Sequence, residues 1–267
     1  MYLSRLILNV RSPQVRRDLA DCHALHRTVM CAFPDLSGDG TAAGRARAQL
    51  GVLFRVESHP RTGATSVVVQ SVTEPDWSRL PERYVLGAGG AAPGPEVKSV
   101  ATAYAAIRTG DELLFRLRAN PTKRMPPSTG ADGVRRDGKR VELRSEDDQL
   151  RWLSEKGAGH PERGRPSAGF RLVTVRARPG LPMVNGATGS SEVADTRARS
   201  VGTVVGTALR EAGGGAARRE ILTFGDVLFE GRLVVTDAEQ FRETLCQGIG
   251  SGKAYGFGLL SVARAPA

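Results

Sequence analysis

Runs of hydrophobic residues mark out strands along this chain, and stretches with helical spacing separate them. The chain opens on a strand over about residues 2–9, and the apolar positions that follow predict a helix from Pro13 towards Phe33. Ser12 and Pro13 suit the start of this helix, because proline is tolerated at the first helical position. The other elements predicted in the first half are two strands, at 52–56 and 66–72.

The second half repeats this order with clearer boundaries. The predicted elements are a strand at 112–118, a helix over 145–156, strands at 170–176 and 221–235, a helix at 237–247 and a final strand at 257–263. The order β-α-β-β-α-β is that of a ferredoxin-like domain. It is complete in the second half and incomplete in the first, so we predict an α+β fold.

Two stretches rich in glycine and proline lack both periodicities. Residues 34–50 read as a flexible loop, and residues 86–98 read as an interdomain linker. The predicted organisation is an N-terminal domain over 1–90, a linker over 91–108 and a C-terminal domain over 109–267.

Glycine recurs near the end of the chain around a single cation, Lys253. The glycines are Gly248, Gly250, Gly252, Gly256 and Gly258. Such spacing lets backbone N–H groups approach a bulky anion. A Walker loop is excluded by Gln247 and Ala254, and a dinucleotide fingerprint is excluded because this loop follows a helix and enters a strand. A purely structural turn remains the alternative.

The charge balance favours a polyanionic partner. Lys and Arg number 38 against 28 Asp and Glu, which gives a net charge of +10. Nucleic acid is the first candidate and an anionic membrane the second. Membrane is disfavoured because no apolar run approaches the roughly 18 residues of a spanning helix, and the N-terminus lacks the pattern of a signal peptide. The three cysteines form no CxxC pair, which suits a reducing cytosol.

His23 and His26 lie in the first predicted helix, and His26 falls on its apolar stripe. One interpretation is a hydrogen-bonded histidine at the edge of the core. A zinc site with Cys22 is disfavoured, because three ligands would crowd one turn and structural sites need four. The third interpretation is catalytic, since histidine moves protons near neutral pH and the neighbouring Arg27 would attract an anion.

Two further basic groups are candidates for nucleic-acid binding. Lys123 and Arg124 end a basic segment that begins at Phe115. Arg210, Arg218 and Arg219 flank a glycine run at 213–215, which favours a hairpin that projects arginines outward. The alternative for each is an ordinary solvated loop.

These residues together resemble the CasE-type CRISPR repeat endoribonucleases, the RNA-processing subunits of the E-subtype Cascade complex. Six blocks in order carry the resemblance: 1–9, 16–28, 73–77, 115–124, 227–233 and 248–258. The resemblance implies tandem ferredoxin-like, RRM-related domains with antiparallel sheets. It places the family's catalytic histidine on His26, whereas His23 stands where members can carry a tyrosine. The second proton-transfer group is therefore His23, Lys253 or bound water.

The chemistry implied by the resemblance is metal-independent and needs no cofactor. The enzyme would cleave CRISPR repeat RNA at the base of its hairpin, by attack of the ribose 2′-OH on the adjacent phosphorus. Arginines would hold the stem, and Lys253 with the glycine loop would serve the phosphate or the fold. The partners would be the repeat hairpin, the mature crRNA and other Cascade subunits. A non-catalytic RNA-binding module and a scaffold subunit remain as alternatives.

Overall fold

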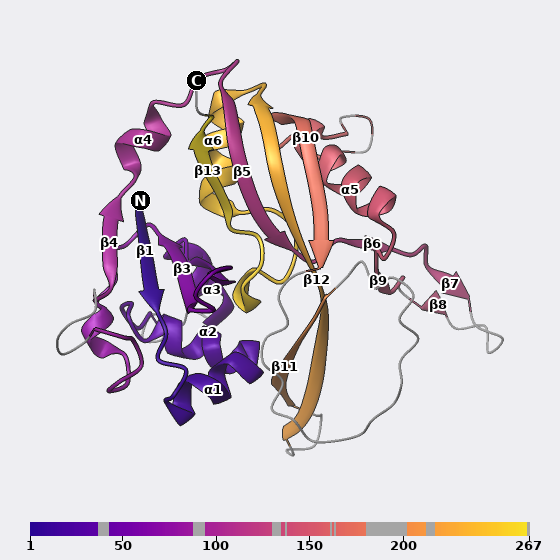
Figure 1. Cartoon of the computed structure of the whole chain (residues 1–267). Coiled ribbons are helices and arrows are strands. Elements are labelled where there is room, and N and C mark those ends of the chain that lie inside the picture. Colours follow the sequence, from indigo (N-terminus) through magenta and orange to yellow (C-terminus); the bar gives the residue numbers. More distant parts are fainter. Residues whose placement is uncertain are drawn as a thin grey trace.

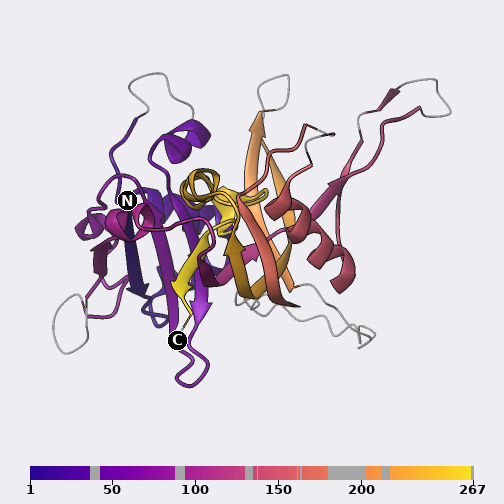
Figure 2. The same cartoon turned by 90° about the horizontal axis from the view of Figure 1, so that it is seen from above.

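The computed structural model describes residues 1–36, 43–87, 94–129, 135–136, 138–160, 162, 164–179, 202–211 and 217–265. Within these ranges, the side chains of residues 43–45, 128–129, 135–136, 202–203, 206–211 and 217–220 are not described. Two antiparallel sheets stand side by side, and each packs helices against its own hydrophobic core (Figures 1 and 2). None of the described helices is long and apolar enough to cross a bilayer.

The first sheet has the strand order β2-β3-β1-β4. Its strands are β1 (Tyr2–Ile7), β2 (Leu53–Ser58), β3 (Thr65–Ser71) and β4 (Glu96–Ser99). All neighbouring strands are antiparallel, and β1 lies in the centre. This is the strand order of a ferredoxin-like domain. The 3-10 turn η2 (Trp77–Arg79) occupies the place of the second helix, which explains why the pattern in the first half looks incomplete.

The second sheet is a complete ferredoxin-like unit with the order β10-β12-β5-β13. Its elements are β5 (Glu112–Ala119), α5 (Glu146–Ala158), β10 (Phe170–Pro179), β12 (Ala217–Val235), α6 (Ala238–Gln247) and β13 (Leu260–Arg264). The prediction of tandem ferredoxin-like domains is thereby confirmed. The division at residues 90 and 108 stays an interpretation.

Two insertions extend this second unit. The short strands β6 (Thr122–Arg124), β7 (Ser128–Thr129), β8 (Arg135–Arg136) and β9 (Arg140–Glu142) form an arm between β5 and α5. The strand β11 (Gly202–Glu211) pairs with the first half of β12, and the hairpin extends well beyond the sheet (Figure 1). The expected arginine-bearing hairpin therefore exists, with Arg210 opposite Arg218.

Three predicted boundaries differ from the structure. The single helix after Ser12 is two helices, α1 (Pro13–Ala20) and α2 (Cys22–Met30), because Asp21 is extended and caps α2. The expected loop over 34–50 contains α3 (Ala43–Gln49), which consists mostly of helix-forming Ala, Arg and Gln. The expected linker over 91–108 contains β4 and the short helix α4 (Ala101–Ala105).

The two sheets lie side by side (Figure 2), and buried polar contacts join the edge strands β2 and β13. Arg55 on β2 is 3% exposed and donates to the Leu259 carbonyl at 3.0 Å and to the Ser261 hydroxyl at 3.1 Å. Gln70 on β3 donates to the Leu245 carbonyl at the end of α6 at 2.6 Å. Because a buried donor left unpaired is costly, these contacts fix how the two units meet.

Candidate active site

The helix α2 is anchored at both ends, which fixes the histidines that it carries. The Asp21 carboxylate accepts the backbone N–H groups of His23 and Ala24 at its start. The fully buried Asp18 of α1 accepts the Thr28 hydroxyl at 2.6 Å and the Tyr84 hydroxyl at 2.9 Å. Burial and the adjacent Asp18 raise the pKa of Tyr84, so this phenol remains a hydrogen-bond donor.

Both histidines of α2 lie against aromatic rings from other elements. The ring of His26 stacks on Phe54 of β2, with centroids 6.3 Å apart and planes at 12°. The ring of His23 lies 6.1 Å from Tyr255. The Nδ1 atoms of both histidines are buried and have no hydrogen-bond partner among the described residues. A purely structural histidine is expected to be satisfied, because burying an unpaired polar atom costs about 1–3 kcal/mol.

The charge state of His26 is set by its surroundings. Burial, the nearby His23 and the charge of Arg47 together lower the pKa of His26 to about 4. The imidazole is therefore neutral at neutral pH and able to accept a proton. This is the state that a general base requires.

The lowered pKa of His26 predicts how the free energy of unfolding varies with pH. Between pH 6.5 and about 4, the unfolded chain binds a proton at this residue and the folded chain does not. Stability should therefore fall as the pH falls through this window, by up to about 1.4 kcal/mol per pH unit for one proton. Urea unfolding of the native chain and of His26→Gln across the window should show a shallower slope for the variant. Identical slopes would show that His26 titrates normally.

Two half-buried cations belong to elements around α2 and β2. Lys253 belongs to the 3-10 turn η4 (Lys253–Tyr255), which contacts both α2 and β2. Arg47 of α3 donates to the Val52 carbonyl at 2.9 Å. Burial and the charge of Arg47 lower the pKa of Lys253. The charge of Arg47 acts on both His26 and Lys253. Among the described residues, no ion pair involves Arg47 or Lys253. The arrangement suits an anion.

The glycine-rich loop links α6 to β13, as predicted, and is closely packed. All five of its glycines have positive φ values. A Cβ atom on Gly248 would lie 2.7 Å from the Gly258 carbonyl oxygen, and one on Gly252 would lie 2.9 Å from the Phe257 ring. The amides of Gly248 and Gly258 donate to the carbonyls of Thr244 and Arg118. These two amides therefore hold the loop and are not available to a phosphate.

A buried ion pair supports the loop from beneath. Arg118 on β5 and Asp226 on β12 are 4% and 0% exposed, and two N–H groups of the guanidinium donate to the two carboxylate oxygens. The guanidinium also lies 5.5 Å from the centre of the Phe257 ring. Phe257 contacts Phe224, and Phe224 contacts Tyr255 beside His23. Loss of one partner would leave a buried charge uncompensated and displace this aromatic cluster.

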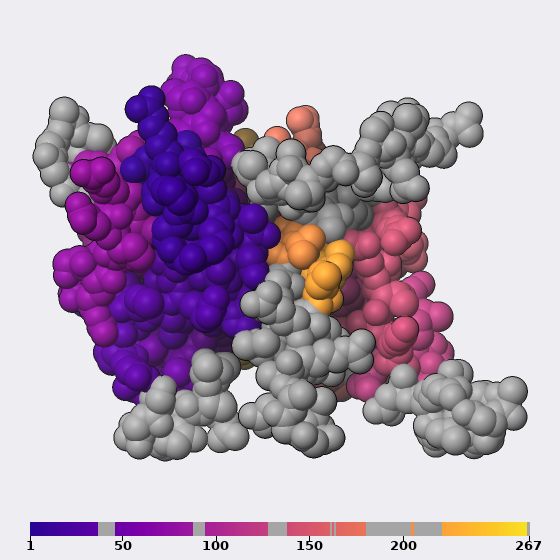
Figure 3. Space-filling view, turned by 90° about the horizontal axis from the view of Figure 1, so that it is seen from below, coloured from indigo at the N-terminus to yellow at the C-terminus, as the bar shows by residue number. Residues whose placement is uncertain are grey.

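The candidate RNA-binding residues occupy three places. Arg27 is exposed on α2. Lys123 and Arg124 of β6 line a cavity of about 870 Å³ that ends at Gly248–Gly250. The backbone of the β11–β12 hairpin carries Arg210, Arg218 and Arg219, whose side chains the structure does not describe. Figure 3 shows residues of the C-terminal domain, in orange and yellow, exposed between the indigo N-terminal domain and the pink part of the chain.

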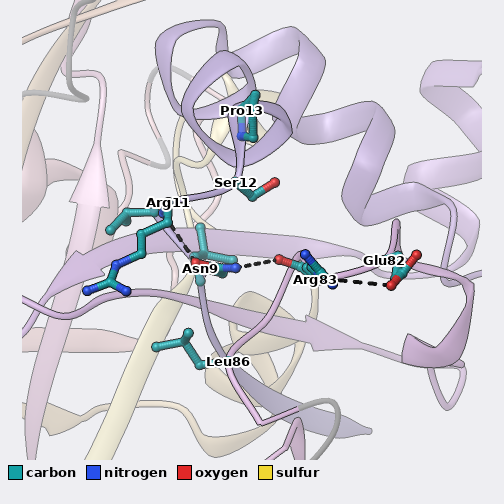
Figure 4. Close-up of a pocket in the computed structure, with 9 residues that line it drawn as sticks. Asn9, Arg11, Ser12, Pro13, Glu82, Arg83 and Leu86 are labelled. Atoms are coloured by element: carbon teal, nitrogen blue, oxygen red, sulfur yellow. Dashed lines mark hydrogen bonds and ion pairs between the residues drawn. The ribbon is translucent and has the colours of Figure 1, made fainter.

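A second cavity of about 790 Å³ lies elsewhere on the N-terminal domain (Figure 4). Asn9 bridges its two sides, because its amide donates to the Arg83 carbonyl at 3.0 Å and its oxygen accepts the Arg11 N–H. It shares no lining residue with the site around His26. We assign it no role in that site.

Three side chains of the site could not be identified from the sequence. Arg47 lies in a segment without hydrophobic periodicity, which we expected to be a loop. Phe54 and Tyr255 occur in recognised segments, but their positions beside His26 and His23 depend on the packing of η4 against α2 and β2. For Tyr255, the sequence offered one signal, which is the presence of an aromatic residue inside a glycine-rich block.

The fold and the site define a tandem ferredoxin-like protein with a neutral histidine under the charge of Arg47, on a helix that contacts the turn carrying Lys253. A sequence model described as CRISPR associated protein matches residues 1–264. CRISPR-associated endoribonuclease Cse3 from Thermus thermophilus is 34% identical over 263 residues, covering 98% of this chain and all of that protein. The chain therefore belongs to the CRISPR-associated protein family.

Two solved structures are similar to this chain. Thermus thermophilus Cse3 bound to an RNA representing a pre-cleavage complex is 33% identical with a TM-score of 0.59, and 98% of each chain is covered. Cas6e from Escherichia coli is 23% identical with a TM-score of 0.56, covering 99% of this chain and all of that chain. The second likeness supports the fold alone.

Proposed function

We propose that this protein is a metal-independent endoribonuclease that cleaves CRISPR repeat RNA at the base of its hairpin. The observation that carries the proposal is the neutral, half-buried His26 on which the charge of Arg47 acts, in a chain 34% identical over nearly its whole length to an endoribonuclease. Cleavage of a phosphodiester by an attacking hydroxyl requires a group that accepts the proton of the hydroxyl and cations that stabilise the charge on the phosphoryl oxygens.

His26 would accept the proton of the ribose 2′-OH, and the 2′-oxygen would attack the adjacent phosphorus. The bond from phosphorus to the 5′-oxygen breaks, and the 5′-oxygen takes up a proton. The products are a 2′,3′-cyclic phosphate and a free 5′-OH. Arg47 and Lys253 would stabilise the negative charge on the phosphorane, which is often the largest catalytic contribution.

His23 is the proposed source of the second proton. It lies one helical turn before His26 on the same side of α2, and its ring contacts Tyr255 of η4. Lys253 is the other candidate, because its lowered pKa makes its ammonium a better acid than an ordinary lysine. His23→Ala should slow cleavage less than loss of His26 does.

The remaining basic residues are proposed to hold the RNA. Side chains can read little of the base sequence in an A-form stem. The β11–β12 hairpin and the arm carrying Lys123 and Arg124 would therefore recognise the shape of the stem and bind its phosphates. We further propose that the protein stays bound to the mature crRNA in the cytoplasm as a Cascade subunit, supported by its family. The alternative is a non-catalytic RNA-binding or scaffold protein of the same complex.

Cleavage should proceed unchanged in excess EDTA. The described residues contain no group of three or more His, Cys, Asp or Glu side chains placed to hold a metal ion, and Mg²⁺ prefers carboxylates and water. The measurement is cleavage of an unprocessed repeat RNA by the isolated protein, with and without the chelator. A strict requirement for Mg²⁺ or Mn²⁺ would contradict the mechanism, and no cleavage under either condition would favour the scaffold alternative.

The arginines of the β11–β12 hairpin should bind phosphates of the RNA. If Arg210, Arg218 or Arg219 binds a phosphate, its change to Gln should reduce the slope of log affinity against log salt by about 0.7–0.9 for each phosphate that is no longer neutralised. Arg61→Gln, in the exposed turn between β2 and β3, is the matched control and should leave the slope unchanged. Unchanged slopes for all three hairpin variants would place the RNA elsewhere.

A further inference from the structure

The cavity beside α5 has an aromatic ring among its cations. Six of its lining residues are basic, against the three acids Asp148, Glu155 and Glu243. The basic residues are Lys123, Arg124, Arg140, Arg151, Lys156 and Arg165. The acids already have partners, because Asp148 pairs with Arg151 and Glu155 with Arg165, each at 3.4 Å, and Glu243 accepts from Gln247. The surplus positive charge favours an anionic chain.

Trp152 of α5 lies in this cavity and is held rigidly. Its ring stacks on the buried Phe229, with centroids 6.1 Å apart and planes at 19°. The backbone at Gly250 approaches so closely that a Cβ atom there would lie 3.1 Å from the indole ring. The exposed Lys156 places its ammonium over the ring, 5.9 Å from its centre, so this flexible side chain has to move aside before a base can stack there.

One end of the cavity is lined by the glycine-rich loop that leads to the candidate active site. Gly248, Ile249 and Gly250 line it, and the same loop leads to Lys253. The charges of Arg47, which also acts on His26, and of Lys156 in the cavity both act on Lys253. The cavity volume of about 870 Å³ lies in the range of about 300–1,000 Å³ that holds a drug-sized ligand, which suits one or two nucleotides but not a duplex.

We propose that this cavity binds the unpaired RNA strand next to the scissile phosphate, with one base stacked on Trp152 and its phosphates held by Lys123, Lys156 and Arg165. This inference rests on the proposed function and assigns the unpaired flank to a particular surface. Stacking on an aromatic ring tolerates any base, so the contact would position the strand without reading its sequence. The stem would then lie on other cations, including those of the β11–β12 hairpin.

The test measures binding of uncleavable RNAs that carry 2′-deoxyribose at the scissile position. Three RNAs are compared: the hairpin alone, the hairpin with its unpaired flanks, and flanked hairpins with one abasic nucleotide at each flanking position in turn. Trp152→Ala should weaken binding of the flanked RNA by about 5-fold to 150-fold, the range expected for one stacked base. Binding of the hairpin alone should be unchanged, and Trp152→Phe should keep most of the affinity.

One abasic position should cause the same loss in the native protein, and Trp152→Ala should add little to it. If Trp152→Ala does not fold, the abasic scan with the native protein and with Trp152→Phe shows whether a base stacks on this ring. Equal losses for hairpin and flanked RNA, or an abasic scan without a sensitive position, would overturn the proposal. Cleavage of the matching all-ribose RNA reports the proposed function separately, so failure of one is not failure of the other.

Discussion

Replacement of His26 by alanine should abolish cleavage of repeat RNA while leaving RNA affinity nearly unchanged. A positioned acid or base contributes about 10²–10⁴-fold to a rate, and His26 is a neutral imidazole on which the charge of Arg47 acts. Binding should survive, because phosphate contacts distributed over a large surface dominate affinity for RNA. Single-turnover cleavage and equilibrium binding with the same RNA measure the two effects separately.

His59→Ala is the matched control for this variant. His59 lies in the turn between β2 and β3, where its Nδ1 accepts the Thr62 N–H, and its loss should leave the cleavage rate unchanged. Parallel losses of binding and cleavage in His26→Ala would instead identify His26 as a structural residue. Circular dichroism of both variants excludes a general loss of fold as the cause.

Replacement of the ribose at the cleavage site by 2′-deoxyribose should stop the reaction completely. The proposed nucleophile is the 2′-oxygen itself, so its removal leaves no group that can form the cyclic phosphate. Affinity should change little, because one hydroxyl is a small part of a surface that contacts phosphates and stem shape. The control is the same substitution one nucleotide away, which should leave the rate nearly unchanged.

Cleavage of the deoxy substrate at the normal rate would mean that water or a protein group attacks the phosphorus. The roles of His26 and His23 would then be open again, whereas the fold and the family would stand. If cleavage stops as expected, the bound deoxy RNA becomes a stable complex for locating the scissile phosphate relative to His26, His23 and Lys253.

Strand periodicity predicted most of the fold, because each strand buries one face against a core. The strands β1, β3, β5 and β12 and the helix α6 follow from alternation and helical spacing in the sequence. The strand β4 was missed because all four of its residues are exposed, so it carries no hydrophobic signal. The break at Asp21 was missed because the apolar stripe runs through both α1 and α2, and a capping side chain ends one helix and starts the next.

The sequence predicted the candidate site only at residues whose type itself indicates a chemical role. His26, His23 and Lys253 stand out in the sequence, and the packing of η4 against α2 brings their segments together. Arg47 could not be found in this way, since one arginine in a basic chain with 38 Lys and Arg residues carries little information. Arg47 matters to the site because it is partly buried and its charge acts on His26. Both depend on how α3, which precedes β2 in the chain, packs in the fold.

The chemical nature of the new RNA end tests the central claim most directly. The isolated protein is incubated with an unprocessed repeat RNA in EDTA, and the 3′ end of the upstream fragment is determined by mass spectrometry. Attack by the 2′-OH with His26 as base predicts a 2′,3′-cyclic phosphate at a single position at the base of the hairpin, and a free 5′-OH on the other fragment. A 3′-hydroxyl with a 5′-phosphate, or no cleavage at all, would contradict the proposed function.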